Sequence, residues 1–348
     1  MKKLIVSILM LFLSVVYILG AKVGTLPQQV LKPEMIRVFD NNVYVLEGAS
    51  ISVISLKDMR FIRKFGKIGE GPGELQVVPF YSIVMHVFPQ YILVDSFNKL
   101  IHFSHEGKVI KEIKKTTEIK EVLPIGKKFV AKKFQAGENG MQFTAVILYN
   151  SNLEEIKELY KQTFPVSKGR IEVIPDSLNF CVENNKVFID RSPEGFVIDV
   201  FDSEGKKLYQ IKKDYKKIKV TEALKNSAIE WLKNDPMVKQ FGSMERVKSV
   251  YKLEFPEYLP AIESMVTSSR KICIGTFNKK DNKEKCLVMD FKGNQLQELY
   301  VPQLQRRKLV DEQFGLARYF YSIDNNKFYY LIENEDDEEW EIHALELK

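Results

Sequence analysis

The stretch Phe103–Ile113, FSHEGKVIKEI, decides how the rest of the chain is interpreted, because copies of it recur. In it an apolar residue is followed by a polar turn and then by alternating apolar positions, the pattern of strand, tight turn and strand. The clearest copies are Phe201–Ile211, FDSEGKKLYQI, and Met289–Leu299, MDFKGNQLQEL. Weaker copies occupy Tyr149–Leu159 and Ile54–Phe65. The chain is therefore expected to consist of repeated β-units.

A further apolar run lies upstream of each copy, and another short strand pattern precedes it, as Ser82–Met85 precedes Tyr91–Val94. Each unit thus predicts a four-stranded antiparallel meander. Five units are complete, and a sixth begins near Leu316 and stops at Lys348 after three strands. The segment Lys22–Leu31 precedes the first unit and has no partner of its own. Because unpaired edges leave backbone groups unsatisfied, this segment is expected to supply the missing strand.

Six units closed in this way predict an all-β fold, a six-bladed β-propeller whose N-terminal strand completes the last blade. A β-sandwich or a two-domain β protein is the alternative, and neither accounts as simply for the truncated last unit. The chain has 348 residues, 45% of them hydrophobic and 28% charged. This composition suits one large globular domain over residues 22–348.

Residues 1–21 have the layout of a secretory signal peptide, with Lys2 and Lys3 followed by the apolar run Leu4–Leu19. The run is shorter than the ~20 residues that a spanning helix needs, which favours cleavage over a retained anchor. We therefore expect a secreted or periplasmic monomer with no membrane span after cleavage. Loss of the two lysines lowers the formal net charge from +6 to +4. That charge is too small to indicate a nucleic-acid partner.

The glycine-rich stretch Phe65–Leu75, FGKIGEGPGEL, admits two interpretations. A phosphate-binding loop requires a helix directly after the glycines, but a strand pattern follows here, and no GxxxxGK[ST] motif is present. The stretch is therefore predicted to be a turn between the first and second units. Glycines allow the sharp turns, and Pro72 fixes one dihedral angle.

Phe65–Leu75, followed by ILVDSFNKLIHFSHEGKVI over Ile92–Ile110, resembles the NHL-type repeat of secreted, TolB-like six-bladed propellers. Asp95, Asn98 and Gly107 stand at positions of that motif, and the resemblance covers roughly residues 65–113. It implies a propeller fold in an extracytoplasmic setting. It implies no single activity, because such propellers include binding modules, lactonases and lyases.

The repeat spacing changes between the fourth and fifth units. There 88 residues separate Phe201 from Met289, against 46 between the copies of the second and third units. The excess predicts a helical insertion at about 221–251, with Thr221 capping the first helix and the second helix beginning at Asp235. This insertion is expected either to cover the central channel or to pack on the edge of a blade.

Cys273 and Cys286 flank the predicted hairpin turn FNKKDN. A symmetric hairpin would place them opposite each other, close enough for a disulfide, and export would permit oxidation. The alternative is two buried thiols. Cys181 is expected to be a core thiol.

Lactonase-like propellers hold a divalent cation in the channel with carboxylate and amide side chains from several inner strands. Glu121, Asn179 and Glu263 fall near the starts of the first strands of units three, four and five, so the resemblance makes them candidate ligands. Arg37 and Arg318, on the first strands of the first and last units, are candidates for binding an anion. The sequence contains no HExxH motif, and no Ser-His-Asp set can be ordered from it.

The leading interpretation is a non-catalytic propeller without a cofactor, which binds a protein, peptide or glycan at the face that carries the helical insertion. A metal-dependent hydrolase or lactonase, using a divalent cation in the central channel, is the alternative. A module of an envelope assembly is a third possibility.

Overall fold

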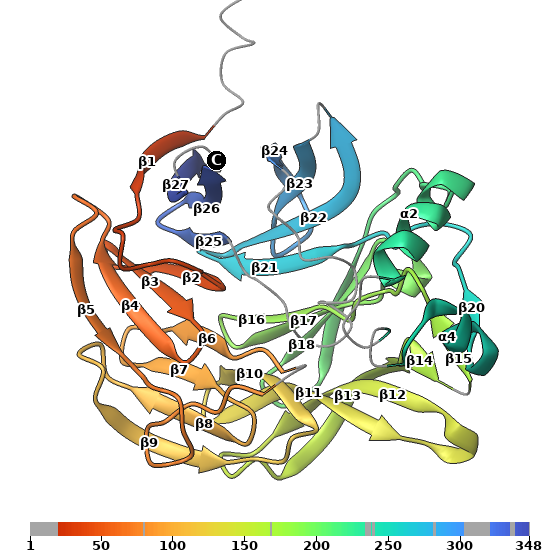
Figure 1. Ribbon diagram of the computed structural model, residues 1–348, viewed down its shortest axis with the longest axis horizontal. Helices are drawn as coiled ribbons and strands as arrows, with labels where there is room; N and C mark the ends of the chain where they lie inside the picture. The colour runs from red at the N-terminus through yellow and green to blue at the C-terminus, as the bar shows by residue number, and fades with distance from the viewer. Residues whose placement is uncertain are drawn as a thin grey trace, which may run out of the picture.

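The structure is a computed structural model that describes residues 20–78, 81–167, 169–233, 238, 241–280, 283–302, 321–334 and 338–347. Over these ranges the chain forms six four-stranded antiparallel sheets, arranged around a common centre (Figure 1). Each sheet contacts the next one along the chain, and the contact between the last sheet and the first completes the circle. This is the architecture of a β-propeller.

The first three sheets follow one another along the chain. Sheet 1 consists of β2 (Met35–Phe39), β3 (Asn42–Glu47), β4 (Ser50–Ser55) and β5 (Phe61–Phe65). Sheet 2 consists of β6 (Val84–Val87), β7 (Ile92–Asp95), β8 (Lys99–Phe103) and β9 (Val109–Lys114). Sheet 3 consists of β10 (Ile119–Ile125), β11 (Lys128–Ala136), β12 (Gln142–Tyr149) and β13 (Glu155–Thr163).

The other three sheets repeat the same order of strands, except that the last takes its outer strand from the N-terminal region. Sheet 4 consists of β16 (Phe180–Glu183), β17 (Lys186–Asp190), β18 (Val197–Asp202) and β19 (Lys207–Lys212). Sheet 5 consists of β21 (Ser264–Ser268), β22 (Lys271–Lys280), β23 (Lys283–Asp290) and β24 (Gln295–Pro302). Sheet 6 consists of β25 (Tyr321–Asp324), β26 (Lys327–Asn334), β27 (Glu339–Glu346) and β1 (Ala21–Thr25).

The predicted closure by the N-terminal segment is confirmed, because β1 pairs antiparallel with β27. Ala21 lies opposite Ala344, and Thr25 lies opposite Glu341. The pairing continues beyond the strand, since the Leu26 N–H donates to the Trp340 carbonyl at 2.7 Å. Both ends of the described chain therefore belong to the same sheet.

Every outer strand contains a β-bulge that leaves one aliphatic residue without a partner on the neighbouring strand. The bulged residues are Val23, Ile62, Ile110, Ile156, Leu208 and Leu296, and β13 has a second bulge at Leu159. A bulge increases the local twist and interrupts the row of free backbone groups at an edge, which hinders edge-to-edge association. The repeat seen in the sequence is thus reproduced in the backbone of all six sheets.

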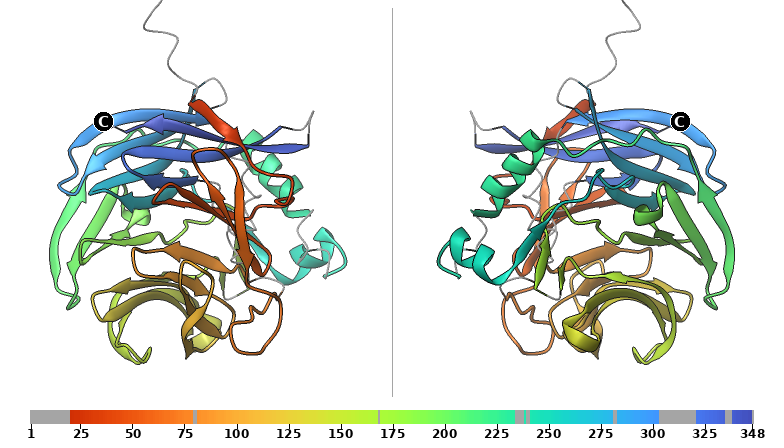
Figure 2. Two further views of the ribbon diagram at one scale, coloured as in Figure 1. Left: turned by 90° about the vertical axis from the view of Figure 1, so that its left-hand side faces the viewer. Right: turned by 90° about the vertical axis from the view of Figure 1, so that its right-hand side faces the viewer.

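A smaller sheet and two helices lie outside this pattern. β14 (Val166–Ser167) pairs with β15 (Arg170–Glu172), and β15 pairs in parallel with β20 (Lys252–Glu254). The helices α2 (Glu222–Lys233) and α4 (Met244–Val250) lie in the chain between β19 and β21 and project from one side of the molecule (Figure 2).

The two helices begin at capping residues and share an apolar core with the smaller sheet. The Leu224 N–H donates to Thr221 Oγ1 at 3.3 Å, as predicted for α2, and Ser243 caps α4. Asp235 lies outside the described residues. Val173, Leu232 and other buried side chains of this region form one cluster. None of the described helices is long and apolar enough to cross a membrane.

The glycine-rich stretch Phe65–Leu75 is a loop between sheets 1 and 2, and its polar groups are satisfied from within the protein. The Gly71 N–H donates to Glu74 Oε2 at 2.8 Å, and the Lys67 ammonium lies 2.7 Å from the same carboxylate. Lys99 Nζ donates to the Gly71 carbonyl at 2.7 Å. A backbone N–H and a lysine of this loop thus bind a carboxylate of the loop itself, in agreement with the predicted turn.

Of the two alternatives that the sequence left open for Cys273 and Cys286, the structure has the two buried thiols and no disulfide, and Cys181 is a buried thiol as well. Lys280 lies opposite Lys283, so the hairpin turn is centred two residues beyond the midpoint of the two cysteines. Cys273 lies opposite Val288, and Cys286 lies opposite Gly275. The two thiols are therefore diagonal neighbours, whose Cα atoms are about 7–8 Å apart in a regular ladder, too far for a disulfide.

Candidate functional site

A cavity of about 560 Å³ lies where the first strands of the six sheets come together. Each of these strands, or the residue just before it, contributes a polar side chain to the wall. These residues are Arg37 of β2, His86 of β6, Glu121 of β10, Asn179 before β16, Glu263 before β21 and Ser322 of β25. The structure therefore brings together four of the five candidates from the sequence, while Arg318 lies outside the described residues. No described residue of α2 or α4 lines this cavity.

Glu121 and Lys132 form an ion pair in the cavity wall. Lys132 Nζ lies 2.8 Å from each oxygen of the Glu121 carboxylate. Lys132 comes from the neighbouring strand β11, and its ammonium is 6.0 Å from the centre of the Phe180 ring. A carboxylate, an ammonium and an aromatic face are thus available at one place, which suits a polar ligand with both donors and acceptors.

Asn179 connects the cavity wall to a buried carboxyl group. Its Nδ2 donates to Asp190 Oδ2 at 2.5 Å, and its backbone N–H donates to the same oxygen at 3.2 Å. Asp190 is 0% exposed, and burial raises its pKa to about 7. Burial, and then the charge of Asp190, raise the pKa of Asp176 to about 8. Two carboxyl groups behind Asn179 therefore titrate near neutral pH.

The opposite part of the wall carries Arg37 and His86. Arg37 Nη1 donates to the carbonyl of Ile36 at 2.8 Å and lies 3.5 Å from the carbonyl of Tyr321. Burial, and then the charge of Arg37, lower the pKa of His86 to about 3. His86 is therefore a neutral imidazole at physiological pH and contributes one donor and one acceptor to the wall.

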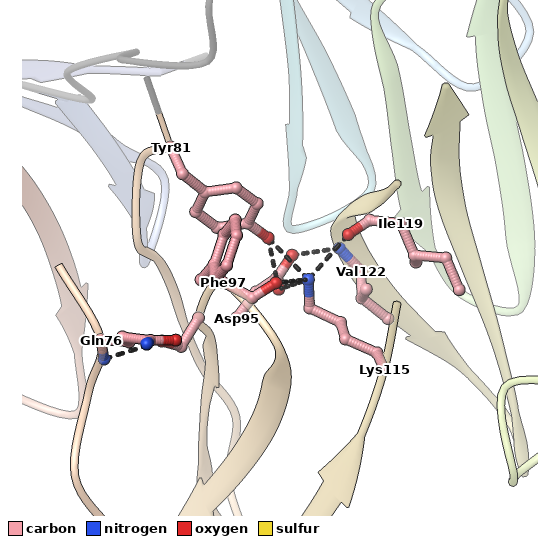
Figure 3. Close-up of polar contacts among 8 residues, drawn as sticks. Gln76, Tyr81, Asp95, Phe97, Lys115, Ile119 and Val122 are labelled. Atoms are coloured by element: carbon pink, nitrogen blue, oxygen red, sulfur yellow. Dashed lines mark hydrogen bonds and ion pairs between the residues drawn. The ribbon is translucent and has the colours of Figure 1, made fainter. Parts of the chain in front are cut away.

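A sealed polar network lies beside the cavity, at the junction of sheets 2 and 3 (Figure 3). Lys115 Nζ lies 3.2 Å from Asp95 Oδ1, and both side chains are almost completely buried. The Tyr81 hydroxyl donates to Asp95 at 3.1 Å and accepts from Lys115 at 2.7 Å. Burial raises the pKa of Asp95 and lowers that of Lys115, while the charge of each partner acts in the opposite direction. Asp95 was marked by the repeat motif, but no sequence signal identified Lys115 or Tyr81 as its partners.

The candidate metal ligands are near one another but already have partners. Glu121 is paired with Lys132, and the Asn179 amide donates to Asp190. Within the described ranges, no group of three or more His, Cys, Asp or Glu side chains is placed to hold a metal ion.

Comparison with known proteins shows the fold and nothing finer. No family model matches the chain, and no curated protein matches it in sequence. A member of the DUF4221 family from Bacteroides vulgatus is similar in structure, with a TM-score of 0.51 and 10% identity over 92% of this chain and 96% of that one. The calcium-binding protein regucalcin from Agrobacterium tumefaciens has a TM-score of 0.42 and 10% identity, over 95% and 96% of the two chains. Hsv2p from Kluyveromyces lactis has a TM-score of 0.40 and 10% identity, over 90% and 74%.

Proposed function

We propose that this chain is an extracytoplasmic binding protein, a six-bladed propeller that takes a segment of a protein, peptide or glycan into its central cavity. Each four-stranded sheet is then one blade, and the helices, with the smaller sheet, form an insertion between blades four and five. The observation that carries the proposal is the cavity itself, whose wall combines ionic, amide and aromatic groups from all six first strands.

Export is proposed from the layout of residues 1–21, and the NHL-type motif supports it. Expression in a bacterial host, followed by mass measurement of the mature protein, tests this part. A mass that corresponds to a chain beginning near residue 22 supports export with cleavage, and a full-length membrane-bound product contradicts it. The bulged outer strands support a monomer, which sedimentation of the mature protein tests.

Binding is tested with arrays of glycans and of peptides, probed with the labelled mature protein. Val182→Trp adds a large side chain to the cavity wall and is expected to abolish any specific signal. Ile156→Trp, on the exposed part of an outer strand, is the matched control and is expected to keep the signal. Specific binding that Val182→Trp leaves unchanged would place the ligand elsewhere, and no binding to either array would contradict the proposal.

A metal-dependent hydrolase is the second candidate, because Glu121, Asn179 and Glu263 do line the same cavity. Metal analysis of the purified protein separates the two functions. About one tightly held calcium or zinc ion per chain, lost in Glu263→Ala, would favour the hydrolase, whereas a metal-free protein that binds a peptide or glycan favours the first proposal.

A further inference from the structure

The backbone of Glu121 differs from that of every other described residue in a strand. Its φ is +53°, and among the described non-glycine residues with positive φ it alone lies within a strand, the others lying in turns or in the short helix at 138–140. The β10–β11 pairing is irregular between Lys120 and Leu123, so two residues of β10 face one of β11. A side chain held in this conformation needs support from its surroundings, and such positions are common at functional sites.

The support comes from the Asp95–Lys115 pair, which contacts the backbone on both sides of Glu121 (Figure 3). Directly after Glu121, the Val122 N–H donates to Asp95 Oδ2 at 3.1 Å. Before the bulge, Lys115 Nζ donates to the carbonyl of Ile119 at 2.7 Å. One buried ion pair thus binds a backbone donor and a backbone acceptor on the two sides of Glu121.

The buried ion pair and the Glu121 carboxylate lie in different environments. Asp95 and Lys115 are sealed from solvent, whereas the Glu121 carboxylate is about one-third exposed and faces the cavity, paired with Lys132. The buried pair contributes no atom to the cavity wall. Its hydrogen bonds to the segment 119–122 are made with the backbone of Ile119 and Val122.

We propose that Asp95 and Lys115 are positioning residues for the cavity, which hold the segment 119–122 so that the Glu121 carboxylate faces Lys132. The inference rests on the proposed function only in treating the cavity as a ligand site. The ligand served by the Glu121–Lys132 pair is then a polar one, such as a sugar hydroxyl array or a peptide backbone, with both donors and acceptors.

The test measures the acetylation rate of Lys132 and needs no ligand. The mature protein is acetylated briefly with an amine-reactive ester, and the rate at each lysine is read by peptide mass spectrometry. Glu121→Gln is expected to raise the rate at Lys132 roughly fivefold or more, because the ammonium loses a charge-assisted interaction with two oxygens. Asp95→Asn is expected to raise it to a similar extent. Lys133 lies next to Lys132 in β11 and pairs with Glu155 of β13. It is the internal reference and is expected to keep its rate.

If Glu121→Gln raises the rate at Lys132 and a folded Asp95→Asn does not, Asp95 does not position Glu121 and the inference is overturned. No change in either variant would overturn it as well. Hydrogen exchange at the Val122 amide needs no variant, so it tests the contact with Asp95 even if Asp95→Asn fails to fold. Slow exchange supports the Asp95 contact, and exchange as fast as in an open loop overturns it. A missing ligand would contradict the proposed function and leave these results as they stand.

Discussion

At the junction of sheets 2 and 3, the buried Asp95 meets the ammonium of Lys115, whereas at the junction of sheets 4 and 5, Asp190 meets the amide of Asn179. The two aspartates occupy the same place in the repeat, since each is the last residue of the second strand of its sheet. Both are 0% exposed. One repeat position thus carries an ion pair in one sheet and an uncompensated carboxyl group in another.

The lysine is present at both junctions but points in different directions. Lys115 and Lys213 each follow the outer strand of their sheet and donate their backbone N–H to the connection between the second and third strands, at 2.9 and 3.1 Å. The Lys115 ammonium turns inward to Asp95, but that of Lys213 lies 3.0 Å from Gln295 of the next sheet. Equivalent positions of the repeat therefore share a backbone hydrogen bond but differ in the partner of the side chain.

The difference decides which junction depends on an ion pair and which one responds to pH. At the first junction, opposite charges compensate each other inside the protein, and removal of either charge leaves the other buried and unpaired. At the second, Asp190 makes no ion pair with any basic side chain in the described part of the chain, and its pKa is raised instead. The first junction supports Glu121, and the second supports Asn179, in neighbouring parts of the same cavity wall.

The largest expected effect is that of Lys115→Met. It leaves the Asp95 carboxylate buried without its counter-charge, so the free energy of unfolding at pH 7 should fall by about 3–5 kcal/mol. Urea denaturation followed by circular dichroism measures it. Lys213→Met is the matched control at the same repeat position and should change the stability by less than about 0.5 kcal/mol, because Lys213 is partly exposed. Equal effects of the two variants would remove the distinction between the junctions.

The second prediction concerns pH. The folded pKa of Asp190, about 7, lies above its ordinary value of 3.8, so the folded protein keeps a proton that the unfolded chain has already released. The stabilisation is therefore complete below about pH 4 and is lost as the pH rises toward 7, by roughly 1.4 kcal/mol per pH unit. Asp190→Asn cannot ionise and should reduce this slope, as measured by urea denaturation between pH 5 and 7. An unchanged slope in this variant would show that Asp190 is ionised in the folded protein.

The sequence predicted the repeated sheets and four residues of the cavity wall, but not His86, Lys132 or Ser322. The repeat fixes where each unit begins, and the residues at the starts of the first strands converge at the centre, so Arg37, Glu121, Asn179 and Glu263 could all be placed there. The closure by β1 followed from a count of strands, since three strands in the last unit required a fourth from elsewhere.

What the sequence could not supply were contacts that depend on side-chain direction or strand register. Lys115 and Lys213 occur in the same sequence context, IKK, and nothing in that context shows which one turns inward. The β22–β23 hairpin turns two residues beyond the midpoint of Cys273 and Cys286, and nothing in the sequence of the turn showed this. The parallel pairing of β15 with β20 joins segments some 80 residues apart, and no local sequence pattern predicts it.

Tyr81→Phe should have a smaller effect than Lys115→Met and should be confined to the first junction. The Tyr81 hydroxyl donates to Asp95 and accepts from Lys115, and hydrogen bonds to charged groups contribute about 1.5–3 kcal/mol each to stability. Because the ion pair itself remains, we expect a total loss of about 2 kcal/mol in the free energy of unfolding, by urea denaturation at pH 7. A loss as large as that of Lys115→Met would mean that the hydroxyl, and not the opposite charge, is the main support of Asp95.

Ser192→Ala tests the second junction and should have the smallest effect. At the first junction, the Val122 N–H at the start of the next sheet is bound by a charged carboxylate, whereas at the second the Ile262 N–H is bound by the neutral Ser192 hydroxyl at 3.1 Å. A neutral hydrogen bond contributes about 1 kcal/mol, so the free energy of unfolding should fall by about that amount at pH 5, where Asp190 keeps its proton. The loss should grow at pH 8, because the Ser192 side chain also lowers the pKa of Asp176 and so stabilises the ionised form of that carboxyl group. A loss that is equal at both pH values would show that the hydroxyl and the carboxyl group of this junction act independently.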